Sequence, residues 1–222
     1  PEITQAHIEG QTARLNALLD RMLRLTGYFS ALAGTLFWVW GRPLAQLLYH
    51  SPEAGFYLET LAPAMPLMYL ESMVDGAMKG IGEQKAAFRY SVWDAVLRIG
   101  GVAVLLPRYG MRGFLAVILL SSFYTCAANT GRLLLSSGTG HAFRRWLGAP
   151  LLAAAAAGTA GRGVRRALAA FPVQGLSGQM AVLTAGGTVT TIVYLLAALP
   201  LGLWEEVWAV LRQEKTGKNR GK

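Results

Sequence analysis

Two groups of charged side chains lie inside apolar stretches of this sequence, where a charge is costly. Glu71, Asp75 and Lys79 follow one another at four-residue intervals, so a helix would carry all three on one face. Asp94 and Arg98 have the same spacing in the next apolar stretch. Charged groups at membrane depth face the interior of a helix bundle or a water-filled cavity. The two groups therefore supply the candidate substrate-binding or cavity-lining residues, namely Glu71, Asp75, Asp94 and Arg98.

Each group has two interpretations. Glu71, the deepest acid, and Asp75 could line a transport path, or they could belong to an i, i+4 ladder that satisfies itself near the cytoplasmic end. Asp94 and Arg98 could form a salt bridge that only lets the helix insert. Alternatively, Asp94 could hold Arg98 so that its planar guanidinium group is offered to a phosphate in a cavity.

Two prolines, Pro63 and Pro66, stand in the first half of the second apolar segment. Proline has no amide N–H and interrupts the hydrogen bonds of a helix. The pair therefore predicts a kink, which is either static or the hinge of a gating helix.

The sequence contains no motif for catalysis or for cofactor binding. His7, His50 and His141 lie at the ends of apolar segments and have no second ligand at metal-binding spacing. A phosphate-binding glycine loop, a dinucleotide fingerprint and a nucleophile motif are all missing. The sequence predicts no catalytic residue, no metal, no cofactor and no enzymatic activity.

Composition favours a membrane protein over a soluble one. Of the 222 residues, 53% are hydrophobic and only 15% are charged, against about 25% charged in soluble domains. The apolar residues form runs of about 20, the length that a helix needs to cross a bilayer core. The net charge of +9 would suggest nucleic acid in a soluble protein. Here the cations lie between apolar runs, which is typical of topology signals and lipid contacts.

The apolar runs predict an all-α fold, a polytopic transmembrane helix bundle of about six spans. The predicted spans are residues 26–49, 57–81, 88–106, 112–135, 146–160 and 180–203. The fifth is the least hydrophobic, because it contains the alanine run 153–157. Such a helix suits the interior of a bundle, where small residues let backbones approach one another.

The predicted bundle, residues 26–203, has a flanking segment on each side. Residues 1–25 form an amphipathic cytoplasmic lead-in helix, whose apolar stripe is Leu15, Leu18, Leu19 and Met22. Residues 204–222 combine an interfacial helix with a basic cytoplasmic tail.

Lysine and arginine residues predict an N-terminus in the cytoplasm. The inner side then holds 14 of these cations and the outer side 6, with Arg98 in the membrane. The outer six are Arg42, Arg108, Arg112, Arg162, Arg165 and Arg166, and the last three form a cluster that counts against this orientation. The predicted location is the cell membrane, as a multi-pass protein, with membrane lipids as partners and no nucleic acid.

Several stretches resemble one group of bacterial exporters. The most specific is LAPAMPLMYLESMVDGAMKGIGEQKAAFRYSVWDAVLRI, residues 61–99. It is similar to a proline-rich span, a short turn and the following span in the stage V sporulation protein B branch. PEITQAHIEGQ with RMLRLT resembles the segment that leads into the second half of these proteins. PRYGMRGF and NTGRLLLSSG resemble an outer turn and a cytoplasmic helix end.

Through these stretches the chain resembles the C-terminal half of a member of the multidrug/oligosaccharidyl-lipid/polysaccharide exporter superfamily. The resemblance implies a polysaccharide biosynthesis C-terminal type of bundle, one lobe of a two-lobed exporter that works by alternating access. It implies a lipid-linked oligosaccharide or peptidoglycan precursor as substrate, flipped across the plasma membrane for cell-wall, spore-wall or polysaccharide synthesis. Because the chain starts at Pro1 rather than at Met, we expect a missing N-terminal half of the same protein.

Two alternatives stay open. One is a cation-coupled multidrug or toxin exporter, in which Glu71 and Asp75 would bind the coupling proton or sodium ion. The other is a membrane scaffold protein that transports nothing. Polar residues inside the spans favour a transporter over a scaffold.

Overall fold

The fold is all-helical, as the apolar runs predict. The computed structural model of the chain describes residues 2–137, 144–169 and 176–203, and every element in these ranges is a helix. In chain order the elements are α1 (Glu2–Ile8), α2 (Thr12–Tyr49), α3 (Pro52–Leu61), η1 (Ala62–Ala64), α4 (Met65–Gly80), α5 (Gln84–Tyr109), α6 (Met111–Ser137), η2 (Arg144–Gly148), α7 (Ala149–Ala169), α8 (Leu176–Ala198) and η3 (Leu199–Leu203). The predicted interfacial helix and tail, residues 204–222, and His141 lie outside the described residues.

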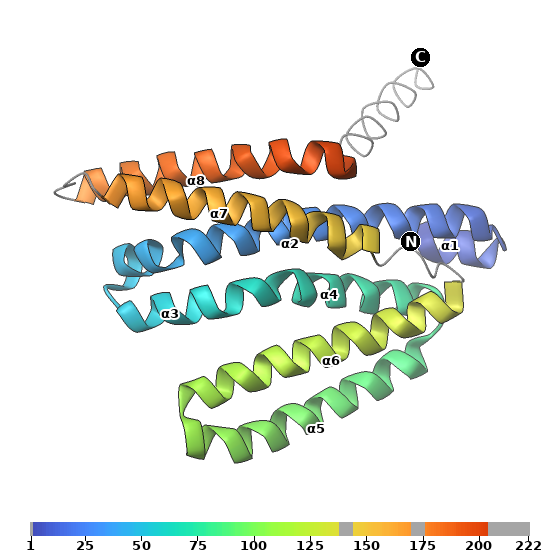
Figure 1. Cartoon of the computed structure of the whole chain (residues 1–222). Helices are drawn as coiled ribbons and strands as arrows, with labels where there is room; N and C mark the ends of the chain where they lie inside the picture. The colour runs from blue at the N-terminus through green and yellow to red at the C-terminus, as the bar shows by residue number, and fades with distance from the viewer. Residues whose placement is uncertain (1, 138–143, 170–175, 204–222) are drawn as a thin grey trace.

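Helix α2 is the centre of the bundle. α7 and α8 pack on one side of it, and α3, η1 and α4 pack on another (Figure 1). α6 packs on α4, and α5 packs mainly on α6, at the edge farthest from α8. The long segments run back and forth, so the bundle has two ends. We call them the Gly82 end, which holds the turn between α4 and α5, and the Gly110 end, which holds the turn between α5 and α6.

Three helical segments are long and apolar enough to cross a membrane. They are Gln84–Tyr109, Met111–Leu135 and Leu176–Leu203, and they coincide with the third, fourth and sixth predicted spans. The other helical segments that run along the bundle contain charged residues or prolines, such as Arg42 and Pro43 in α2. Three apolar helices of this length indicate a membrane protein, whereas the full set of six spans stays a prediction.

The predicted lead-in helix, residues 1–25, is interrupted between α1, which ends at Ile8, and α2, which begins at Thr12. From Thr12 onward it is continuous with the first predicted span. α2 runs without a break through residue 25. Leu15, Leu19 and Leu23 are buried in one cluster with residues of α4. Met22, which belongs to the predicted apolar stripe, is 37% exposed. The face turned toward α4 repeats at four-residue steps, so Leu23 rather than Met22 occupies the buried position.

The alanine run packs α7 against α2 and α8. Ala153 and Ala157 are fully buried in a cluster with Tyr28 and Tyr194, and the Tyr194 hydroxyl donates to the Tyr28 carbonyl oxygen at 2.8 Å. Small side chains allow this close approach, as expected for an interior helix. α7 continues to Ala169, beyond the predicted end of the fifth span, so the arginine cluster lies on the helix itself.

Pro63 and Pro66 change the type of helix between α3 and α4. A proline has no amide N–H to donate to the carbonyl four residues earlier, and here the chain forms the 3₁₀ turn η1, in which the Met65 amide donates to the Ala62 carbonyl oxygen. This turn lies against α2 at Gly34, where a β-carbon would come within 2.7 Å of the Ala62 carbonyl oxygen. The structure thus shows a change of helix type at the two prolines, while a kink and a gating movement stay predictions.

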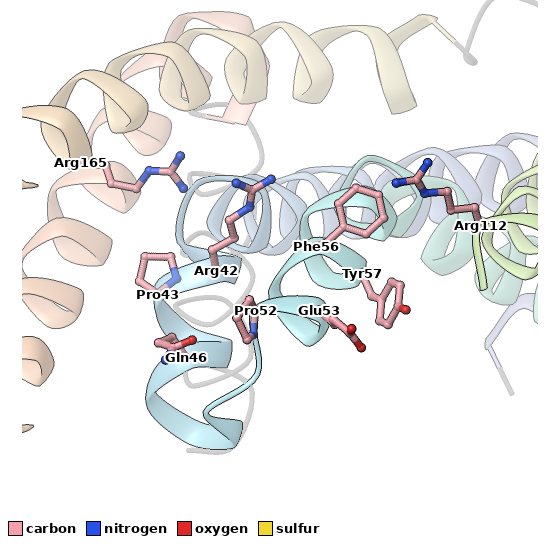
Figure 2. A pocket seen from close by; sticks show the side chains of 9 residues that line it. All are labelled: Arg42, Pro43, Gln46, Pro52, Glu53, Phe56, Tyr57, Arg112 and Arg165. Atoms are coloured by element: carbon pink, nitrogen blue, oxygen red, sulfur yellow. The ribbon is translucent and has the colours of Figure 1, made fainter. Parts of the chain in front are cut away.

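A cavity of about 860 Å³ opens at the Gly110 end (Figure 2). It is formed by α2, α3, α6 and α7, and its lining residues are Arg42, Pro43, Gln46, Pro52, Glu53, Phe56, Tyr57, Arg112 and Arg165. Three of the arginines that the charge pattern assigns to the outer side therefore meet around one cavity.

Candidate functional site

The Asp94–Arg98 ion pair lies near the middle of α5. Arg98 Nε is 2.9 Å from Asp94 Oδ2, one helical turn away. Arg98 follows the first residue of α5, Gln84, by fourteen residues and precedes the last, Tyr109, by eleven. The pairing that the spacing allows is therefore present, at the depth where an unpaired charge would cost most.

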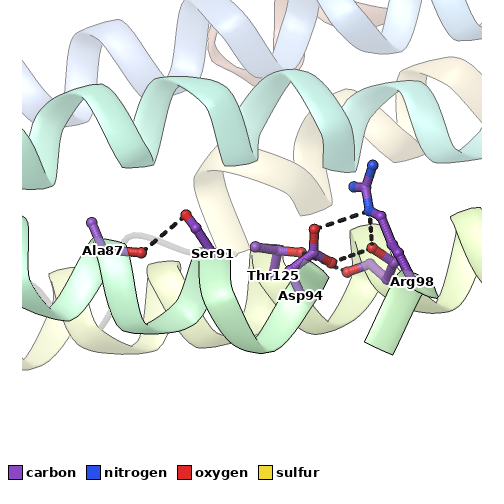
Figure 3. Close-up of polar contacts among 6 residues, drawn as sticks. Ala87, Ser91, Asp94, Arg98 and Thr125 are labelled. Atoms are coloured by element: carbon purple, nitrogen blue, oxygen red, sulfur yellow. Dashed lines mark hydrogen bonds and ion pairs between the residues drawn. The ribbon is translucent and has the colours of Figure 1, made fainter. Parts of the chain in front are cut away.

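Two hydroxyl groups of α6 complete this site (Figure 3). Ser121 Oγ accepts a hydrogen bond from Arg98 Nε at 2.6 Å and donates one to Asp94 Oδ1. Thr125 Oγ1 lies 3.2 Å from the same Asp94 oxygen. Both hydroxyl side chains are buried, at 0% and 3% exposure. Hydrogen bonds from α6 thus hold the ion pair in place, in addition to the pairing of its two members within α5.

Sequence reasoning overlooked Ser121 and Thr125, because single hydroxyl groups are common in apolar helices. A signal was present, since Ser121, Thr125 and Asn129 recur at four-residue steps within an otherwise apolar segment. All three are buried. The Asn129 Oδ1 atom has no hydrogen-bond partner among the described residues. α6 therefore carries a buried polar face. Ser121 and Thr125 of this face, together with Asp94 and Arg98 of α5, form what we call the Arg98 site.

The two charges of the ion pair differ in their exposure. The Asp94 side chain is 15% exposed and the Arg98 side chain 45%. In the described part of the chain, the terminal Nη groups of Arg98 have no hydrogen-bond partner, and they point away from the Asp94 carboxylate on the side toward α4 (Figure 3). A guanidinium group halfway along an apolar helix is strongly disfavoured against lipid tails. This face of α5 therefore requires water or another polar group beside it.

Glu71 of α4 approaches the same site from a neighbouring helix. It is partly buried and lies close enough to Asp94, Arg98 and Thr125 to interact with them electrostatically. Asp75 instead forms an ion pair with Lys79, with 2.6 Å between Asp75 Oδ2 and Lys79 Nζ. Glu71, Asp75 and Lys79 therefore do not act as one group. Glu71 lies with the Arg98 site, whereas Asp75 and Lys79 form an ion pair with each other.

The two prolines lie apart from the Arg98 site. Pro63 and Pro66 line a mostly apolar cavity of about 210 Å³ between α2, η1 and α7. The structure therefore brings Glu71, Asp94 and Arg98 together, and leaves Asp75 and both prolines outside.

The charged side chains of the Arg98 site can bind ions. Within the described ranges, no three His, Cys, Asp or Glu side chains are grouped as metal ligands would be. One guanidinium group with two unused N–H edges can bind an anion such as phosphate. The carboxylates of Glu71 and Asp94 can bind a proton or another small cation.

The fold and the site together define an all-helical chain with three helices long and apolar enough to cross a membrane and a polar site between helices. The chain is similar to the sporulation protein YkvU of Bacillus subtilis (strain 168), with 27% identity over 137 residues. The aligned residues are 62% of this chain and span 29% of the length of that relative. No family model matches the chain, and no solved structure matches it. The similarity fits a sporulation-related membrane protein.

Proposed function

We propose that the chain is one lobe of a plasma-membrane exporter that flips a lipid-linked oligosaccharide or peptidoglycan precursor by alternating access. The observation that carries this proposal is Arg98, a half-exposed arginine in the middle of an apolar helix with two N–H edges unused. A lipid-linked sugar carries a pyrophosphate, and a guanidinium fork is the side chain best suited to bind it. Asp94 and Ser121 hold the guanidinium group of Arg98 in this orientation before the substrate binds.

The arrangement of the helices supports the same proposal. α2, α3 with η1 and α4, α5, α6, α7 and α8 each run from one end of the bundle to the other (Figure 1). We take these as the six spans of one lobe, surrounded by membrane lipids. The second lobe would come from further residues of the same protein, in line with a relative of much greater length. The name of that relative favours a role in sporulation.

The test is complementation of a strain that lacks the gene, with variants made in the full-length protein. We expect Arg98→Ala to abolish function and Arg98→Lys to restore little, because lysine keeps the charge but lacks the planar fork. Arg89→Ala is the matched control, since Arg89 is an exposed arginine of the same helix outside the site. Immunoblots of membranes establish that each variant is made and inserted.

The Asp94→Ala and Arg98→Ala double variant separates transport from structure. If the pair were structural only, removing both charges would be tolerated better than removing one, because no charge would be left unpaired. A working double variant with failing single variants would therefore refute the phosphate-binding role. It would favour a scaffold protein without transport.

A second candidate function is cation-coupled export of a drug or toxin. The observation in its favour is that Asp94 and Asp75 both lie within electrostatic range of Glu71. Carboxylates gathered inside a membrane are typical of proton or sodium pathways. In that case Glu71 would be the coupling residue, and Arg98 would set its affinity for the cation.

A further inference from the structure

The cavity at the Gly110 end gathers positive charge from three helices. Arg42 comes from α2, Arg112 from α6 and Arg165 from α7, and their guanidinium groups extend toward the middle of the cavity (Figure 2). The cavity lies at the opposite end of α5 and α6 from the Gly82 turn. It is distinct from the Arg98 site, which lies halfway along those helices.

The position of Arg165 beside the cavity depends on a proline in α2. Pro43 has no amide N–H, so the Val39 carbonyl four residues earlier lacks its normal helical partner. Arg165 Nη1 donates to this carbonyl oxygen at 2.6 Å and lies 3.1 Å from Glu59 Oε1. α7 is thereby attached to α2 at the level of the cavity.

Glu59 forms ion pairs with two of the arginines, Arg42 and Arg165. Its Oε2 lies 2.8 Å from Arg42 Nε, and its Oε1 faces Arg165, so both carboxylate oxygens are occupied. The Glu59 side chain is 15% exposed, whereas Arg42 is 60% exposed. One carboxylate between two arginines leaves a positive charge on the open side of Arg42.

Arg112 adds positive charge at the N-terminal end of α6, which already favours an anion. It lies in the first turn of α6, where unpaired backbone N–H groups give the helix end a partial positive charge. Among the described residues Arg112 has no ion pair. Glu53 is the one acid that lines the cavity, so the lining arginines outnumber the acids even when Glu59 is included.

Apolar side chains also line the cavity. Pro43, Pro52, Phe56 and Tyr57 are among the lining residues, and the two aromatic rings meet edge to face with centroids 5.8 Å apart. Arginines next to aromatic rings suit a phosphate that is joined to a less polar group.

We propose that this cavity binds a phosphate group, contacted by Arg42 and Arg112 and with Arg165 as a positioning residue. The phosphate belongs either to an anionic lipid headgroup or to a free anion. This inference is independent of the transport function and of Arg98.

The test is a binding titration of the full-length protein in detergent. The probes are a short-chain phosphatidylglycerol, a phosphatidylcholine with the same acyl chains, and inorganic phosphate. We expect Arg112→Gln to weaken binding of phosphatidylglycerol about tenfold, as the loss of one charged hydrogen-bond donor would. Arg112→Lys should lose less, because the charge remains. Arg108→Gln is the matched control, since Arg108 is exposed at the same end but does not line the cavity.

The probes separate the two sources of phosphate. Binding of phosphatidylglycerol but not of inorganic phosphate identifies a lipid headgroup, and displacement of the lipid by inorganic phosphate identifies the anion itself. Arg112→Gln should keep the melting temperature of the wild type, because Arg112 has no ion pair to lose in the described structure. The proposal is overturned if neither phosphate probe binds more tightly than phosphatidylcholine. It is also overturned if Arg108→Gln weakens binding as much as Arg112→Gln.

Discussion

Arg98 on α5 and Ser121 on α6 are joined by a hydrogen bond of 2.6 Å between Nε and Oγ. The same hydroxyl group donates to Asp94, so one serine contacts both members of the ion pair. The orientation of the guanidinium group therefore depends on how α5 packs against α6. A change in that packing would move Arg98 relative to anything bound beside it.

Removing this hydroxyl group should impair the site without removing a charge. We expect Ser121→Ala to lower function in the complementation assay about tenfold, because hydrogen bonds to charged groups contribute about 1.5–3 kcal/mol. Ser91→Ala is the control: the Ser91 hydroxyl donates to the Ala87 carbonyl oxygen of its own helix at 3.0 Å (Figure 3). Equal function of the two variants would show that Ser121 does not position Arg98.

Helix positions could be predicted because the signals for them are local. The length of an apolar run predicts a helix, and glycines predict the turns. Gly82 and Gly110 have φ angles of 82° and 58°, values that glycine adopts without strain. The Asp94–Arg98 pair could be predicted for the same reason, since four-residue spacing places the two side chains on adjacent turns.

Contacts between helices could not be predicted, because they depend on how each helix is rotated and where it crosses its neighbour. The four-residue spacing places Glu71 deeper than Asp75 on one helix face, but it does not show that Glu71 approaches Arg98 while Asp75 pairs with Lys79. Ser121 meets Arg98 across two helices. The cavity at the Gly110 end joins residues from Arg42 to Arg165, a separation that no local pattern encodes.

The orientation of the bundle can be tested by cysteine labelling. The sequence has one cysteine, and Cys126 is buried, so Cys126→Ser provides the background. In intact cells we expect an impermeant maleimide to label Met111→Cys but not Gln84→Cys, because the positive charge favours a cytoplasmic Gly82 end. Met111 is 47% exposed, so a cysteine at this position is accessible to the reagent. Labelling of Gln84→Cys alone would reverse the orientation.

Packing of α8 on α2 can be tested at two adjacent glycines. A β-carbon at Gly186 would lie 2.1 Å from the ring of Trp40, which is held by a hydrogen bond to Thr190. We expect Gly186→Ala to destabilise the protein by about 1–3 kcal/mol through overpacking. Gly187→Ala should leave the melting temperature in detergent unchanged or slightly higher, because no atom lies within 4 Å of its β-carbon and alanine favours a helix. Similar melting temperatures for both variants would mean that α8 does not pack on Trp40 as described.

Glu71 and Asp75 form the last test, because they have the same chemistry on one helix and different surroundings. Glu71 lies beside Asp94 and Arg98, whereas Asp75 is paired with Lys79, whose side chain is 59% exposed. If a proton or sodium ion drives transport through Glu71, Glu71→Gln should abolish function while the protein remains folded and inserted. Asp75→Asn should reduce function little, since a largely exposed ion pair contributes about 0–1 kcal/mol. Complementation with membrane immunoblots measures both variants. Full function of Glu71→Gln would exclude coupling through this carboxylate, and the Arg98 site would then have to act on its substrate without it.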